Sequence, residues 1–118
     1  MNNEAFVNLI KKHSRDFTID WAEGDNSGVT KEAQDWQSSL SIQEKAFLRE
    51  IVTEALDNGI VNLLEIMDGV HPDNSCPIEA SAGNNKISGQ GCKQLHDLYA
   101  GKIEQVEACS PFGLDLRQ

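Results

Sequence analysis

The sequence is short of basic residues, with 10 Lys and Arg against 19 Asp and Glu and a net charge of −9. A surface of this sign repels the phosphate groups of nucleic acids and of anionic membranes. We therefore expect no direct binding to nucleic acid or to a membrane. If the chain binds another protein, we expect that partner to be basic.

Long apolar runs and paired cysteines are missing as well. No stretch approaches the roughly 18 continuous apolar residues of a transmembrane helix, and Met1 to Glu4 lack the charged and apolar segments of a signal peptide. The 3 cysteines lack the spacing of a disulfide framework, which is typical of a reducing compartment. A length of 118 residues predicts one domain, 1–118, which the patterns described below predict to be helical. From the missing signal peptide and the cysteine usage, we expect this domain in the cytoplasm.

The strongest pattern in the chain predicts a long central helix. Ser41 and Glu44 have the Ser-x-x-Glu spacing of a capping box at a helix start. Asp68-Gly69 followed by Pro72 is a typical helix end. We therefore predict one helix from Ser41 to Asp68.

Apolar residues recur along this helix with the period of a single buried face. They are Phe47, Leu48, Ile51, Val52, Ala55, Leu56, Ile60, Leu63, Leu64 and Met67. The period continues through Asn58-Gly59, so we predict that the helix passes through this dipeptide unbroken. Gly59 lies in the middle of the apolar face. Since an interior glycine costs about 1 kcal/mol against alanine, we expect a neighbouring element to approach closely there.

Shorter patterns predict the other elements. Helices are expected from Asn3 to about Phe17 with Asn3 as the cap, from Thr30 to about Ser39, and from Cys92 to Val106. Residues 70–91 have the composition of a loop insertion, with a small β-hairpin around Gly83-Asn84-Asn85. Residues 110–118 are expected to form a C-terminal tail. The predicted fold class is mostly α (α+β), with three to four helices around one long central helix.

Five acidic side chains form a column on the central helix, opposite its apolar face. They are Glu50, Glu54, Asp57, Glu65 and Asp68. No Lys or Arg occurs between positions 50 and 85, and Lys11, Lys12 and Arg15 are expected on the outer face of the first helix. A solvated helix face explains such a column. An uncompensated acidic surface also attracts basic partners, so the column is the first candidate for a partner-binding site.

The segment from Asp20 to Gly28 is predicted as an acidic loop. It does not fit an EF-hand, because positions 3 and 5 counted from Asp20 are Ala22 and Gly24 and offer no side-chain oxygen. Its tryptophan is expected either to fold back on the core or to be exposed as a binding anchor. The loop adds four residues to the candidate partner-binding site: Asp20, Trp21, Glu23 and Asp25.

Four Cys and His residues support an alternative, a zinc site or a Cys–His enzyme. They are His71, Cys76, Cys92 and His96. Cys92 and His96 are four residues apart on a predicted helix, where both could bind one zinc ion, and Cys92 near the helix N-terminus has the setting of a reactive thiolate. The chain has no Cys-x-x-Cys or His-x3-His pair. We therefore predict no metal, no cofactor and no enzymatic activity.

In size, in charge and in stretches such as Glu50-Ile-Val-Thr-Glu54-Ala-Leu-Asp57, the chain resembles the small acidic immunity proteins of bacterial toxin–immunity systems, including contact-dependent growth inhibition. The resemblance implies a cytoplasmic protein that neutralises a toxin domain, for example a nuclease, by binding it tightly. Two alternatives remain open at this point. One is the Cys/His site, and the other is an adaptor or oligomer subunit whose acidic face is only solvated.

Overall fold

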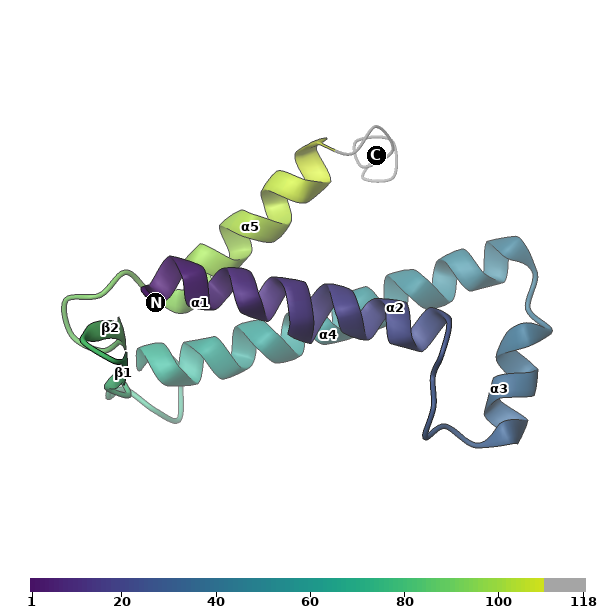
Figure 1. Ribbon diagram of the computed structural model, residues 1–118, viewed down its shortest axis with the longest axis horizontal. Coiled ribbons are helices and arrows are strands. Elements are labelled where there is room, and N and C mark those ends of the chain that lie inside the picture. The colour runs from purple at the N-terminus through teal and green to yellow at the C-terminus, as the bar shows by residue number, and fades with distance from the viewer. Residues whose placement is uncertain (110–118) are drawn as a thin grey trace.

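The computed structural model describes the backbone of residues 1–109 and the side chains of residues 1–104. Its elements are α1 (Asn3–Leu9), the π-helix η1 (Ile10–Asp16), α2 (Phe17–Glu23), α3 (Lys31–Ser38), α4 (Ile42–Asp68), β1 (Ala80–Ala82), β2 (Asn85–Ser88) and α5 (Leu95–Cys109). Because α1, η1 and α2 follow one another directly, the described part of the chain forms four helical rods and one hairpin (Figure 1). The predicted mostly α fold is confirmed. The expected tail, 110–118, lies outside the described residues.

The central helix α4 is continuous over 27 residues, about 40 Å of helix. It begins with the predicted capping box: Ser41 Oγ accepts from the Glu44 N–H at 3.1 Å, and Glu44 Oε1 accepts from the Ser41 N–H at 2.8 Å. Gly69 ends it in the left-handed conformation, with φ 74°. The prediction of one helix through Asn58-Gly59 is therefore confirmed. In the described part of the chain, no helix is long and apolar enough to cross a membrane.

The N-terminal rod is longer than predicted. Asn2, and not Asn3, caps it, because the Asn2 side chain accepts a hydrogen bond from a backbone N–H of the first turn. The rod continues to Glu23. Asp20, Trp21 and Glu23 therefore lie on α2, and their assignment to an acidic loop is wrong.

The middle of this rod is π-helical, so its N–H groups bond to carbonyl groups five residues earlier, as Phe17 does to Lys12. The wider turn rotates the later side chains out of the α-helical phase on which the prediction relied. Phe17 of the predicted apolar face is consequently 66% exposed. Leu9, which lies before the π-helix, is 46% exposed. Arg15, expected on the outer face, is buried.

The hydrophobic core is small and lies around the C-terminal half of α4. Its buried members are Val7, Leu64, Ile87, Leu95 and Tyr99, which come from α1, α4, β2 and α5. α5 packs on both α1 and α4, and β2 packs on α1. The hairpin lies at this end of the molecule and α3 at the opposite end (Figure 1). The N-terminal half of α4 is therefore far from most of the core.

The predicted hairpin is present as the antiparallel pair β1–β2, with Ala82 opposite Asn85 and a register irregularity beside Ala80. Gly83 occupies the turn with φ 62°, a conformation that glycine adopts easily. Ile87 is 6% exposed and belongs to the core, so packing against the helices supports a hairpin that would be marginal alone.

The apolar face predicted for α4 is exposed only in part: Leu64 is buried and Leu48, Val52, Leu56, Ile60 and Met67 are half-buried. Phe47, Ile51 and Leu63 are 55%, 65% and 55% exposed. At Gly59 an added Cβ would meet no atom of the described structure within 4 Å, so the expected close neighbour is not there. The prediction of the buried face is therefore wrong for these positions. The buried residues of α4 are Asp57, Leu64 and Asp68.

Gly59→Ala should stabilise the protein, because the open space accepts a methyl group and alanine suits a helix interior better than glycine. We expect the free energy of unfolding, measured by urea titration, to rise by roughly 0.5–1 kcal/mol. Gly69→Ala is the matched control. Gly69 has φ 74° and an added Cβ would clash with the Pro77 backbone, so this variant should lose stability. A destabilised Gly59→Ala protein would show that a neighbour packs at that position.

Candidate partner-binding site

Two members of the acidic column are buried and are not available to a partner. Asp57 is 7% exposed and Asp68 is 8% exposed. The prediction that the whole column lies on the outer face of the helix is therefore wrong for these two residues. Each of them instead connects α4 to another helix.

Asp57 connects α4 to two other rods. Its carboxylate accepts from Arg15 Nε at 2.7 Å and Arg15 Nη2 at 3.2 Å, and from the Tyr99 hydroxyl at 2.6 Å. Arg15 lies on η1 and Tyr99 on α5. Arg15 Nη1 also donates to Asp16 Oδ1 at 2.9 Å. The first rod thus supplies the positive charge that the sequence around the column lacks.

The protonation of this cluster follows from burial and hydrogen bonding. Burial alone would lower the pKa of Arg15, but hydrogen bonds to Asp57 and Asp16 outweigh it and the pKa is raised. The pKa of Tyr99 is raised by burial and then by its hydrogen bond to Asp57. Both side chains therefore keep their protons and remain donors. Burial would raise the pKa of Asp16, but hydrogen bonds from Lys11 and Arg15 lower it.

Asp68 caps the start of α5 from the end of α4. Its two oxygens accept from the Leu95 and His96 backbone N–H groups, both at 2.9 Å, and Oδ2 lies 2.7 Å from His96 Nδ1. A carboxylate is stabilised at a helix N-terminus by the unpaired N–H groups and by the helix dipole. The role of Asp68 is therefore to hold α4 and α5 together.

The other candidate residues are accessible. Glu50, Glu54, Asp20, Trp21, Glu23 and Asp25 are exposed, and Glu65 is half-buried. They form two groups, one along α4 and one at the end of α2. Glu23 is paired with Arg49 of α4, but both side chains are exposed and such pairs contribute little to stability.

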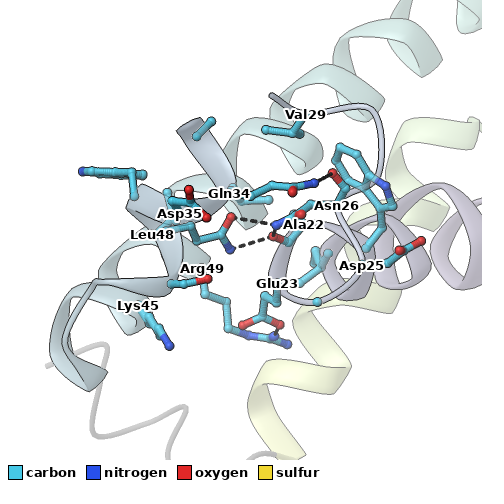
Figure 2. Close-up of a pocket in the computed structure, with 18 residues that line it drawn as sticks. Ala22, Glu23, Asp25, Asn26, Val29, Gln34, Asp35, Lys45, Leu48 and Arg49 are labelled. Atoms are coloured by element: carbon cyan, nitrogen blue, oxygen red, sulfur yellow. Dashed lines mark hydrogen bonds and ion pairs between the residues drawn. The ribbon is translucent and has the colours of Figure 1, made fainter. Parts of the chain in front are cut away.

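The group at the end of α2 borders an open pocket of about 550 Å³ (Figure 2). The pocket lies between α2, the loop after it, α3 and the N-terminal half of α4. Trp21, Glu23 and Asp25 line it, so the structure brings three of the predicted residues together. Its further apolar lining comes from Ile19, Val29, Ala33, Trp36, Leu48 and Val52. Both the volume and the apolar lining are typical of sites that accept a ligand or a partner side chain.

Polar side chains, and not a hydrophobic core, fasten α3 over this pocket. No residue of α3 is buried. Gln37 Nε2 donates to the Ala22 carbonyl at 2.7 Å, Asn26 Nδ2 donates to Gln37 Oε1 at 3.0 Å, and Gln34 Nε2 donates to the Asn26 carbonyl at 3.2 Å. Figure 2 shows Gln34 and Asn26 meeting between the loop and α3. The roof of the pocket therefore depends on a few hydrogen bonds.

The other residues that line the pocket were not predicted from the sequence, among them Trp36, Leu48 and Arg49. Trp36 was covered only by the short helix expected from Thr30 to about Ser39, and Leu48 was expected on a buried face. One signal in the sequence could have indicated the pocket. Trp36 lies on a helix too short to bury it, directly before a long helix that has apolar residues of its own. Only the fold shows that α3 stands over the start of α4.

The four residues of the proposed Cys/His site do not meet. His96 is bound to Asp68, and His71 Nδ1 accepts from the Asp73 N–H at 3.1 Å. Cys92 precedes α5, so its placement on the same helix as His96 is wrong. Among the described residues, no three His, Cys, Asp or Glu side chains are grouped so that they could hold a metal ion.

A comparison with known proteins found no matching family model, no matching curated protein and no matching solved structure. Function is therefore inferred from the residues and geometry described above. The resemblance to immunity proteins stays a prediction.

Asp57→Ala should destabilise the protein strongly, because it leaves Arg15 buried without its main partner. Breaking a buried ion pair in this way costs about 3–5 kcal/mol, and we expect a loss of that size in urea unfolding. Glu54→Ala is the matched control on the same helix. Since Glu54 is exposed, its loss should change stability by less than about 0.5 kcal/mol. Equal effects of the two substitutions would contradict the structural role of Asp57.

Asp16→Asn should make stability depend less on pH in the acid range. The pKa of Asp16 is lowered from 3.8 in the folded protein, so its contribution is present above that value and is lost as the pH falls through the folded pKa. We expect the variant to be less stable than the parent at neutral pH, with a difference that shrinks in acid. Urea unfolding at a series of pH values measures this. A difference that is constant with pH would contradict the assignment.

Proposed function

We propose that the protein is a small acidic cytoplasmic protein that binds and neutralises a basic protein partner, and that the partner is a toxin domain, as for the immunity proteins that the chain resembles. One observation carries the proposal. Two accessible tryptophans, Trp21 and Trp36, line an open pocket beside exposed carboxylates, at the end of the molecule that is far from most of the core.

The tryptophans supply the contact area that a tight complex needs. Trp36 is 58% exposed and Trp21 is 38% exposed, although tryptophan is costly to leave in water. Binding energy at protein interfaces concentrates in a few such residues, which are buried in the complex and surrounded by near-neutral contacts. The pocket between them offers space for an apolar side chain of the partner.

The charges favour a basic partner. The chain carries a net charge of −9, and Glu50, Glu54 and Asp25 are exposed around the N-terminal half of α4 and the pocket. Such a surface accelerates association with a basic protein and disfavours acidic ones. The buried pair of Asp57 and Arg15 does not take part in this attraction, because its charges are already matched inside the fold.

The purified chain is first used to capture a basic protein. The identity of the captured protein is then compared with the product of the gene next to the one that encodes this chain. The complex of the two purified proteins is then measured. Glu50→Lys combined with Glu54→Lys should weaken binding by more than about 1 kcal/mol, mainly through slower association that is sensitive to salt. Trp36→Ala should cost about 2 kcal/mol or more through faster dissociation.

Asp73→Lys is the matched control for charge. It makes the same reversal on an exposed residue beyond the end of α4. This variant should bind nearly as the parent does. Production of the partner alone should arrest bacterial growth, and production of this chain should restore it. Binding that is insensitive to salt, to the Glu reversals and to Trp36→Ala would overturn the proposal.

A further inference from the structure

The exposed side of α4 carries an ordered line of apolar and small residues. Phe47, Ile51, Ala55, Gly59 and Leu63 are spaced by four along the helix, and we call them the apolar row. Its three large members are 55%, 65% and 55% exposed, and Ala55 is exposed as well. Residues spaced by four form one of the ridges by which helices pack on each other. Because each step of four residues turns 40° around α4, the row winds across the exposed side, and a helix that crosses α4 meets its middle.

The side chains at the centre of the apolar row are small. Ala55 and Gly59 are the two smallest residues of the row, and an added Cβ at Gly59 would meet nothing of the described structure within 4 Å. Within the described residues, Gly59 has no structural role that requires a glycine, since the helix is unbroken there and glycine destabilises a helix interior. A helix laid across this point could approach α4 closely, with Ile51 and Leu63 packing on either side.

Carboxylates border the apolar row. Glu44 and Glu50 lie one helical turn from Phe47, before it and after it, and Glu54 lies one turn after Ile51. Both Glu50 and Glu54 are exposed. No Lys or Arg occurs between residues 50 and 85, so the basic residues near the row, Lys45 and Arg49, are confined to its start. A helix that fits this surface needs an apolar face bordered by positive charges.

A second copy of this chain does not satisfy that requirement. Its own α4 is bordered by the same carboxylates, and each copy carries a net charge of −9. Two copies therefore repel each other, whereas a basic helix is attracted.

We propose that the apolar row is a docking surface for an amphipathic helix whose apolar face is bordered by Lys and Arg. The inference rests on the proposed function and assigns this helix to the basic partner. Leu48 and Val52, one position after Phe47 and Ile51, line the pocket beside α3, so the row is continuous with the pocket along α4. One partner could therefore cover both.

The probe is a fluorescein-labelled synthetic peptide of about 18 residues, five helical turns, with Leu on one face and Lys elsewhere. Its binding to the full chain is measured by fluorescence anisotropy at about 0.15 M salt and at about 0.5 M salt. A second peptide carries Glu in place of every Lys. We expect the Lys peptide to bind, with an affinity that falls as salt rises, and the Glu peptide to bind at least about tenfold more weakly.

Gly59→Leu is the decisive variant, because it places a large side chain at the centre of the apolar row, where an added Cβ meets no described atom within 4 Å. It should weaken the Lys peptide at least about tenfold while the melting temperature does not fall. Ile42→Ser is the matched control, since Ile42 is 90% exposed on the same helix but is not in the row. This variant should bind as the parent does.

The remaining outcomes overturn the inference. Equal binding of both peptides, or an unchanged affinity in Gly59→Leu, would show that the row does not select a basic helix. A dimer in analytical ultracentrifugation that Gly59→Leu dissociates would show that a second copy covers the row. If the purified basic partner binds with the expected dependence on Glu50 and Trp36 but the Lys peptide does not, this inference fails and the proposed function stands. If neither binds, both fail.

Discussion

The contact of Asp57 with Arg15 and Tyr99 determines how the helices of this protein sit on one another. It draws η1 and α5 to the same point of α4 through three hydrogen bonds to one carboxylate. The buried Arg15 guanidinium is costly unless it is paired. Because Asp57 is its main partner, α4 is rotated so that Asp57 faces inward. At 100° per residue, Ala55 and Gly59 then lie on the far side of the helix. The exposure of the apolar row is thus a direct result of burying an acid.

The capping signals explain why the element pattern was predictable. Ser41, Glu44 and Gly69 act through hydrogen bonds and dihedral angles within a few residues, and the structure has all three in their expected roles. Thr30 likewise caps α3, and the glycine turn forms the hairpin. Such signals are local, so they can be read from the sequence without knowing the tertiary structure. The continuous helix and the mostly α fold follow from them.

The rotation of each helix was not predictable in the same way. The period of α4 contains both an apolar and an acidic side, and the sequence alone favours burying the apolar one. Two contacts with residues far away in the sequence reverse this preference at Asp57. Arg15 of η1 and Tyr99 of α5 both donate hydrogen bonds to its carboxylate. The π-helical turn has no sequence signal that the analysis could use. The candidate site was therefore predicted in part, with Glu50, Glu54 and Trp21 exposed but Asp57 and Asp68 buried.

The placement of the two tryptophans gives the protein an internal optical reporter. Trp21 and Trp36 are the only 2 tryptophans of the sequence, and both line the pocket under α3. The main core contains Tyr99 and no tryptophan. Emission excited at the red edge of the indole band therefore reports the solvation of the pocket and the position of α3, while far-ultraviolet circular dichroism reports the long helices. Because no residue of α3 is buried and amide hydrogen bonds hold the helix to the loop before it, the two signals are free to change at different denaturant concentrations.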